Sequence, residues 1–283
     1  MLFGLCASAV APGLVAAPAP ARAEPAFSRI VSLNVCADQF LIAFGLADRV
    51  VAFGPIVRDP VLSFYADRAG GLPTTAASAE SVLLLRPDIV LAGPFAGLLA
   101  KRVLRAEGVR IEEIGIPQTI AEARRQILDL AAFFGVPERG AAIVAELDAV
   151  LAAVPDGPRP RALYLQRRLF ATGEGTLVDD LLAHTGFDNA LSGTAPPGIS
   201  RFSLESLAGI PADVLVLDGR GGGDGDQGAA VLLHPLVERL YPADRRIVLP
   251  LSSIVCAGPP LVEAVKTLVA ARQRLGSTVG TRP

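Results

Sequence analysis

The chain has 283 residues, of which 51% are hydrophobic and 19% are charged, and its formal net charge is −2. This composition is typical of globular proteins with one large or two smaller domains, and it excludes collagens, coiled coils, disordered chains and polytopic membrane proteins. The near-neutral charge gives no electrostatic drive toward nucleic acid, so no nucleic-acid partner is expected. Only two histidines are present, which excludes a histidine-rich metal site.

Residues 1–23 have the composition of an export signal. They are rich in Ala, Val and Leu, contain no acidic residue, and end in Ala21-Arg22-Ala23, a small-residue cleavage site before Glu24. The segment lacks the basic residue that usually opens such a signal, and an uncleaved apolar N-terminus is therefore the alternative. We expect cleavage after Ala23 and export of the mature chain.

The mature chain keeps two cysteines, Cys36 and Cys256. An oxidising compartment would allow them to form a disulfide if their Cα atoms lie within about 7 Å of each other. The alternative is that both are small, buried apolar side chains. The sequence leaves both possibilities open.

Short β-branched segments alternate with helical patterns along the mature chain. Examples are the strands predicted at residues 29–33, 50–53 and 88–92, and the helices predicted at residues 37–46, 79–86 and 120–134. Such alternation is typical of an α/β fold whose strands are mostly parallel.

An internal repeat indicates two similar lobes. The segment Ser78-Ala79-Glu80-Ser81-Val82-Leu83 is echoed by Ser203-Leu204-Glu205-Ser206-Leu207-Ala208, and each copy leads through a proline and an aspartate into a predicted strand. A weaker echo pairs residues 29–34 with residues 161–166. A repeat this long does not describe a solenoid. It predicts two parallel-sheet lobes built on one plan.

A single long helix is predicted between the lobes. Apolar residues follow helical spacing over residues 136–154, and Pro137 suits the start of a helix. The predicted organisation is a signal at 1–23, an N-terminal lobe at 24–136, a linking helix at 137–156 and a C-terminal lobe at 157–283. One helical connection is stiff, so the lobes should close by a modest angle only.

A ligand is expected in a cleft between the lobes, because ligands of parallel α/β sheets bind at the carboxyl ends of the strands. Arg168 and Arg201 would suit a carboxylate or phosphate, and Phe95 and Phe170 would suit an apolar or ring-bearing part. For each candidate, a surface or packing role is the alternative. The candidates are Asn34, Cys36, Arg58, Phe95, Gln166, Arg168, Phe170, Arg201 and Ser252.

No catalytic motif is found, and no enzyme, catalytic residue, resident metal or cofactor is expected. The chain lacks G-x-S-x-G, H-E-x-x-H and P-loop sequences. A G-x-G-x-x-G match at residues 223–228 lies several residues beyond the preceding predicted strand and contains two aspartates, which would repel phosphate. An α/β enzyme, such as an oxidoreductase or a chelatase-like subunit, is the alternative from a different class.

Glu80 and Glu205 occupy equivalent positions in the repeat, each two residues after a serine. An acid in the first turn of a helix stabilises it through the helix dipole, which would explain both residues locally. Alternatively, one acid per lobe would present two charged points to arginine pockets of a two-fold symmetric partner. The residues alone leave these two explanations open.

The chain resembles the substrate-binding proteins of bacterial ABC importers, of the helical-backbone type that includes iron–siderophore and vitamin B12 binders. The resemblance covers nearly all of the mature chain. It is carried by Arg29-Ile30-Val31-Ser32-Leu33, Ser78-Ala79-Glu80-Ser81, Leu85-Arg86-Pro87-Asp88-Ile89-Val90, Leu181-Leu182, Gly186-Phe187-Asp188-Asn189, Ser203-Leu204-Glu205 and Gly258-Pro259-Pro260.

The resemblance implies a monomeric periplasmic protein without catalytic activity, which delivers a metal chelate to an ABC permease dimer in the inner membrane. It also implies that Glu80 and Glu205 dock onto arginines of that dimer. A ferric siderophore is the first expectation for the ligand, and cobalamin or a heme-type tetrapyrrole is the alternative. The absence of tryptophan departs from the vitamin B12 binders.

Overall fold

Strands and helices alternate along the chain, as the sequence predicts. The computed structural model describes residues 27–95, 97–219, 230, 232 and 234–279, so the cleavage site after Ala23 and the glycine-rich segment at 223–228 lie outside the described residues. The elements are β1 (Ile30–Ser32), α1 (Val35–Ala43), η1 (Ala47–Arg49), β2 (Val50–Ala52), η2 (Pro55–Arg58), η3 (Ala66–Arg68), α2 (Ala79–Leu84), β3 (Ile89–Ala92), α3 (Leu98–Ala106), β4 (Ile111–Glu113), α4 (Ile120–Phe133), α5 (Pro137–Leu151), β5 (Arg161–Leu165), η4 (Arg167–Leu169), β6 (Phe170–Thr172), α6 (Leu177–His184), β7 (Asp188–Asn189), β8 (Ile199–Arg201), α7 (Leu204–Ala208), β9 (Val214–Asp218), α9 (Pro235–Leu240), η6 (Ala243–Arg245), β10 (Arg246–Leu249), α10 (Leu251–Ile254) and α11 (Leu261–Val279).

The N-terminal lobe is built on a four-stranded sheet with the order β2-β1-β3-β4. All three pairings are parallel, and Ile30 lies opposite Ile89 in the central pair. The central strands β1 and β3 are fully buried, which explains their nearly continuous apolar sequences. The parallel sheet predicted for this lobe is confirmed.

The C-terminal lobe has a six-stranded sheet in which β10, β9, β5 and β7 are parallel. Strands β6 and β8 extend it with antiparallel pairings, which the sequence analysis did not anticipate. The cause is the short connection at residues 166–169, which reverses the chain, whereas a parallel strand needs a crossover of a dozen or more residues. This lobe is therefore a parallel core with an antiparallel extension.

Helix α4 spans from one lobe to the other. At its start, the Ile120 amide donates to the Asp180 carboxylate of α6 at 2.7 Å, and Ile120 packs in the core of the C-terminal lobe. At its far end, Leu130 and Phe134 pack in the core of the N-terminal lobe. The helix therefore contributes apolar side chains to both cores.

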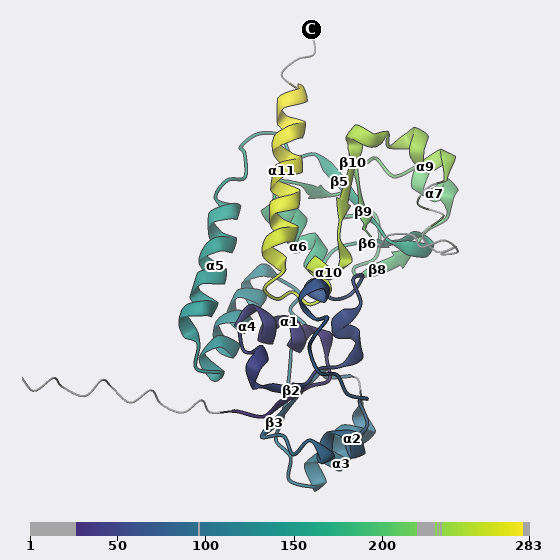
Figure 1. Ribbon diagram of the computed structural model, residues 1–283. Coiled ribbons are helices and arrows are strands. Elements are labelled where there is room, and N and C mark those ends of the chain that lie inside the picture. Colours follow the sequence, from purple (N-terminus) through teal and green to yellow (C-terminus); the bar gives the residue numbers. More distant parts are fainter. Residues whose placement is uncertain (1–26, 96, 220–229, 231, 233, 280–283) are drawn as a thin grey trace, which may run out of the picture.

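Helix α5 overlaps the linking helix predicted at residues 137–156 but ends at Leu151, and it packs along α4 (Figure 1). Its Ile143 contacts both hydrophobic cores. The two helices approach so closely that a Cβ at Gly140 would lie 2.5 Å from the Ala131 Cβ, which explains a glycine within a helix. Two packed helices, α4 and α5, therefore form the helical backbone between the lobes, where the sequence predicted a single helix.

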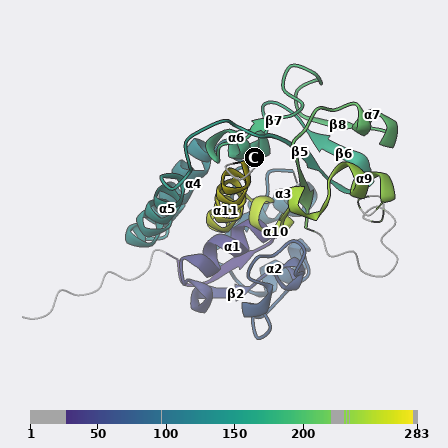
Figure 2. The ribbon, with the colours of Figure 1, turned by 90° about the horizontal axis from the view of Figure 1, so that it is seen from above.

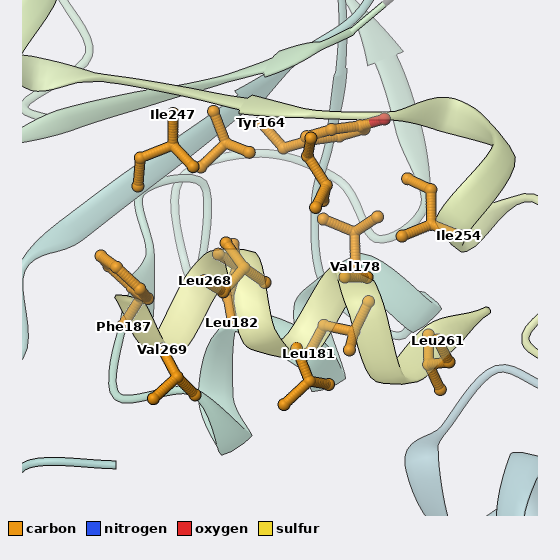
Figure 3. Close-up of a cluster of buried hydrophobic side chains, with 14 of the residues drawn as sticks. Tyr164, Val178, Leu181, Leu182, Phe187, Ile247, Ile254, Leu261, Leu268 and Val269 are labelled. Carbon is orange, nitrogen blue, oxygen red and sulfur yellow. The ribbon is translucent and has the colours of Figure 1, made fainter. Parts of the chain in front are cut away.

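The core of the C-terminal lobe lies between its sheet and helices α6 and α11. Figure 3 shows Tyr164 and Ile247 on the sheet side of this cluster, with Leu182 and Leu268 on the helix side. Helix α11 also contacts α5, so it holds the linking helix against this lobe. Although α11 has 19 residues, neither it nor any other described helix has the length and apolar composition needed to cross a membrane.

A carboxyl group, that of Asp38 on α1, is fully buried in the N-terminal lobe. Neither of its oxygens has a hydrogen-bond partner among the described residues, and the neighbouring Ser32 hydroxyl donates to the Asn34 carbonyl at 3.3 Å. Burial raises the pKa of Asp38 from 3.8 to about 8, and the proximity of the Ser32 hydroxyl opposes this shift to a smaller extent. Asp38 is therefore mostly protonated in the folded protein at neutral pH.

We expect Asp38→Asn to change how stability depends on pH. The unfolded chain ionises this carboxyl near pH 3.8 and the folded chain near pH 8, so the folded state holds an extra proton between these values. The stabilisation from that proton is fully present below the unfolded pKa, and it is lost at about 1.4 kcal/mol per pH unit as the pH rises toward the folded pKa. Asp38→Asn cannot ionise, so urea unfolding should show a flatter pH profile and greater stability than the wild type near the folded pKa.

The matched control is Asp129→Asn, which removes an exposed carboxyl on α4. It should keep the pH profile of the wild type. If the profiles of Asp38→Asn and the wild type are parallel, the carboxyl of Asp38 is already ionised in the folded protein and its predicted protonation is wrong.

Candidate functional site

A covalent bond joins the segment that follows β1 to the segment that follows β10, which shows that the carboxyl ends of the two sheets face each other. We refer to the segments at these strand ends as the interlobe face. They are residues 34–38, 54–58, 93–95, 97–99 and 114–118 of the N-terminal lobe, and residues 166–170, 201 and 250–257 of the C-terminal lobe. Each of the predicted ligand-binding residues lies on one of these segments.

The covalent bond is a disulfide between Cys36 and Cys256, whose Cα atoms are 5.0 Å apart. Cys36 lies in the first turn of α1, and Cys256 lies two residues after the end of α10. The Gln39 side chain adds a contact, since its Nε2 lies 3.4 Å from the Cys256 sulfur. Of the two possibilities that the sequence left open, the structure has the disulfide.

Asn34 caps helix α1. Its Oδ1 accepts hydrogen bonds from the amides of Cys36 and Ala37, at 2.9 and 3.3 Å, and so satisfies donors that the helix start leaves free. A Cβ at Gly93 would lie 2.7 Å from the Asn34 Nδ2, so the ends of β1 and β3 are in close contact. The structure gives Asn34 a capping role, and its contact with a ligand stays a prediction.

Arg58 holds the loop that follows it. Its Nε donates to the Ala69 carbonyl at 3.3 Å and its Nη2 donates to the Leu72 carbonyl at 2.6 Å. These bonds fix residues 59–72 against the end of η2. Arg58 therefore has a structural role here, and the predicted ligand contact again stays a prediction.

The turn between β5 and β6 presents Arg168 on the interlobe face. The Gln166 amide donates to the Phe170 carbonyl at 2.7 Å and closes the turn. Arg168 and Leu169 have φ values of 56° and 60°, which lie in the left-handed region that non-glycine residues avoid at a cost of about 1–2 kcal/mol each. Strain of this kind is concentrated at functional sites, which favours a role for this turn.

Arg201 lies beside the same turn. It is opposite Phe170 in the pairing of β6 and β8, and the next amide, that of Phe202, donates to the Leu169 carbonyl at 2.9 Å. The side chains of Arg168 and Arg201 are exposed, and among the described residues neither forms an ion pair. The structure therefore brings the two predicted arginines to one edge of one lobe.

Two other candidates of this lobe are engaged within the protein. The Gln166 Nε2 donates to the Thr172 hydroxyl at 2.8 Å, and Ser252 is buried within α10. Their contact with a ligand stays a prediction.

The N-terminal side of the interlobe face is apolar. The Phe95 side chain is 81% exposed at the end of β3. Its apolar neighbours on this face could not be recognised from the sequence, because helical spacing favours apolar residues that face a core. These exposed neighbours are Leu98, Leu99, Ile116 and Ile56.

Two surface hollows lie in the C-terminal lobe and away from the interlobe face. Both are lined by Arg161, the first residue of β5, which places them toward the amino end of that strand. Since ligands of parallel α/β sheets bind at the opposite ends of the strands, we assign neither hollow as the ligand site.

Lys101 of α3 is buried, which its sequence pattern does not predict. Its Nζ donates to the carbonyls of Gly93 and Pro94, each at 2.8 Å, and to the Glu113 carboxylate at 3.0 Å. These partners use all three protons of the ammonium group. Lys101 therefore holds the chain at the end of β3, directly before Phe95.

The two repeated segments fold alike and form the starts of α2 and α7. The hydroxyls of Ser78 and Ser203 each accept a hydrogen bond from the amide three residues further on, at 3.2 and 3.1 Å. Glu80 and Glu205 then occupy the second helical position of each copy and are exposed. Hydrogen bonds from its own backbone amide and from the Ser203 hydroxyl hold the pKa of Glu205 below its ordinary value of 4.5, so this carboxylate is charged at neutral pH.

The two histidines make local contacts. The Nδ1 of His184 lies 2.8 Å from the Asp180 carbonyl, and the Nδ1 of His234 accepts from the Leu236 amide at the start of α9. Among the described residues, no group of three or more His, Cys, Asp or Glu side chains is arranged to hold a metal ion.

A family profile described as "Periplasmic binding protein" matches residues 30–245, which is most of the chain. A search of curated proteins finds no match. The fold, in contrast, is shared with many solved structures.

The apo form of the periplasmic heme-binding protein RhuT from Roseiflexus sp. RS-1 is 25% identical, over 87% of this chain and 99% of its own, with a TM-score of 0.67. The periplasmic heme-binding protein BhuT in complex with two hemes is 26% identical, over 87% of this chain and 98% of its own, with a TM-score of 0.66. An ABC-type Fe3+-hydroxamate transport system from Saccharomonospora viridis DSM 43017 is 21% identical, over 87% of this chain and 93% of its own, with a TM-score of 0.66. This third likeness shows the fold alone.

We expect Lys101→Met to lower the free energy of unfolding by about 2–4 kcal/mol, because the carbonyls of Gly93 and Pro94 would lose their buried donor. The only other lysine of the chain, Lys266, makes partly exposed ion pairs with two glutamates. Lys266→Met is therefore the matched control and should cost less than about 1 kcal/mol. Urea unfolding measures both changes, and equal losses would contradict the role of the buried ammonium group.

Proposed function

This chain belongs to the periplasmic binding protein family, and from that premise we propose that it captures a ferric siderophore in the periplasm and delivers it to an ABC importer of the inner membrane. Proteins of this family bind small-molecule chelates and work with ABC transporter permeases. We choose a siderophore over heme and vitamin B12 on the basis of the residues of the interlobe face.

One observation carries the proposal. The N-terminal side of the interlobe face exposes apolar side chains, above all Phe95, and the C-terminal side exposes the guanidinium groups of Arg168 and Arg201. Apolar surface on one edge and exposed cations on the facing edge suit a ligand with an apolar body and anionic groups. An anionic ferric chelate has both properties.

The interlobe face offers no free side chain of the kinds that bind heme iron, which are His, Cys, Met and Tyr. Its cysteines, Cys36 and Cys256, are joined to each other. His184 and His234 lie on α6 and at the start of α9 and contact their own helices. The chain's only methionine is Met1, at the start of the predicted signal.

The three tyrosines also lie outside the segments of the interlobe face. Tyr164 and Tyr241 are buried in the cores of the C-terminal lobe. The Arg68 guanidinium lies over the Tyr65 ring, 5.0 Å from its centroid, and burial raises the pKa of Tyr65, which disfavours a tyrosinate ligand. These residues favour a chelate whose own donors complete the coordination of the metal.

Heme is the second candidate, and a specific observation favours it. RhuT and BhuT, the two solved structures compared above at 25% identity or more, are heme-binding proteins. Heme also combines an apolar ring with carboxylates, so the arginine edge would suit it as well. The two candidates differ in whether the protein must supply a ligand to the metal.

Docking on the permease is proposed for Glu80 and Glu205. Each is exposed at the start of a short helix, one in each lobe, and α2 and α7 lie well apart in Figures 1 and 2. The same serine cap precedes both, so each glutamate stands at the second position of a capped helix. Two matched acids suit arginine pockets on the two halves of a permease dimer.

We expect calorimetry to show saturable, stoichiometric binding of an anionic ferric siderophore by the purified mature protein. Thermal shift and calorimetry are suitable because the chain has no tryptophan to report binding. Heme and cobalamin are the other ligands of the panel. Tight binding of heme alone would replace the first candidate by the second, and no binding by any member, or turnover of one, would contradict the proposed function.

Arg168→Gln and Arg201→Gln should each weaken binding by about tenfold or more, since each removes a charge-assisted hydrogen bond. Arg125→Gln is the matched control, because Arg125 is exposed on α4 and lies outside the interlobe face. Unchanged affinity in both variants would remove these arginines from the binding site.

The double variant Glu80→Arg, Glu205→Arg should abolish uptake of the chelate while its affinity stays unchanged, because the reversed charges would repel arginines of the permease. Uptake by cells and calorimetry on the purified protein measure the two properties separately. A loss of affinity would place these residues in the binding site, and normal uptake would contradict their role in docking.

A further inference from the structure

The Cys36–Cys256 disulfide connects the two lobes directly. Cys36 belongs to α1 of the N-terminal lobe and Cys256 follows α10 of the C-terminal lobe, 220 residues further along the chain. Both segments follow the carboxyl ends of strands, so the bond lies on the interlobe face itself.

Each partner of the bond is anchored in the core of its own lobe. Phe40, one turn after Cys36, is buried in the N-terminal core, and Ala257, next to Cys256, is buried in the C-terminal core. Gly258 packs directly on the Phe40 ring, since a Cβ at Gly258 would lie 3.1 Å from it. A displacement of either lobe is therefore transmitted to the bond and is not absorbed by a loose loop.

The lobes have a second, separate connection through the helices α4 and α5. In the view of Figure 2, α4 and α5 lie to one side of α1 and α10, which are near the centre. Two rigid bodies that are held at two separate places retain one rotation, about the axis through both places. Shear and twist between the lobes would stretch the disulfide or disrupt the packing of α4 and α5.

We propose that the Cys36–Cys256 bond is an interlobe tie, which restricts the lobes to a small opening about one axis and so presets the spacing of the interlobe face. This inference goes beyond the proposed function, because it concerns the protein without ligand and holds for any ligand. The oxidised protein therefore has a narrower range of lobe arrangements than the reduced protein.

The first test compares Cys36→Ser, Cys256→Ser and the double variant with the wild type, each as a ligand-free monomer isolated by gel filtration. Hydrogen exchange of the amides in α1 and α10 should become about tenfold faster or more, and small-angle scattering should show a broader distribution of distances. Because each single variant already breaks the bond, all three variants should give the same change. Additive effects of the single variants would indicate packing by each sulfur separately and would overturn the proposal.

The second test uses the wild type, so it does not depend on the folding of a variant. Dithiothreitol transfers two electrons and two protons to the disulfide, giving two thiols and the cyclic disulfide of the reagent. Reduction should reproduce the exchange and scattering of the double variant and should leave that variant unchanged. Faster exchange confined to one of the two helices, or no change at all in a protein that circular dichroism shows to be folded, would contradict an interlobe tie.

Discussion

The burial of α4 and α5 in both hydrophobic cores at once is the interaction on which the arrangement of the lobes depends. Ile120 at one end of α4 belongs to the C-terminal core and Phe134, directly after its other end, to the N-terminal core, while Ile143 of α5 contacts both. Each large apolar side chain buried in this way contributes about 1.5–3 kcal/mol. Separating the lobes would expose these side chains, so core packing at α4 and α5 sets the orientation of one sheet relative to the other. The facing of the two carboxyl edges follows from that packing, and the disulfide joins edges that the helices already bring together.

The two lobes share one plan but differ at the strand ends. The starts of α2 and α7, with their exposed glutamates, have the same hydrogen bond from a backbone amide to a serine hydroxyl in both copies. At the interlobe face the copies diverge, because the antiparallel strands β6 and β8 widen only the C-terminal sheet and carry Phe170 and Arg201 to its edge. The proposed function fits this division. A symmetric permease would contact the repeated starts of α2 and α7, and an asymmetric ligand would contact the strand ends, which differ between the lobes. The repeated and the divergent parts of the chain therefore correspond to the two proposed partners.

The strands and helices could be predicted from the sequence where local chemistry decides them. The β-branched run at residues 29–33 forms β1, and the helical spacing after Pro137 forms α5. Contacts between residues far apart in the sequence could not be predicted in this way. Helical spacing shows which face of α4 is apolar, but it does not show that the two ends of this face enter different cores. Lys101 was missed because a charged residue in a helix is normally exposed, and only the carbonyls at the end of β3 explain its burial. The candidate ligand residues could be placed at the strand ends by topology, whereas hydrogen bonds such as those of Arg58 depend on the folded loop.

At the left-handed turn of Arg168 and Leu169, the residue that would be most stable is not the residue that offers a side chain to a ligand. Glycine would adopt these φ values at no steric cost. Replacing Arg168 or Leu169 by glycine would, however, also remove a side chain from the end of the sheet. A selection for heat resistance alone would therefore favour the loss of this arginine. Engineering for stability alone would therefore remove the Arg168 side chain from the interlobe face. A melting curve would not reveal this loss, because it does not measure ligand binding.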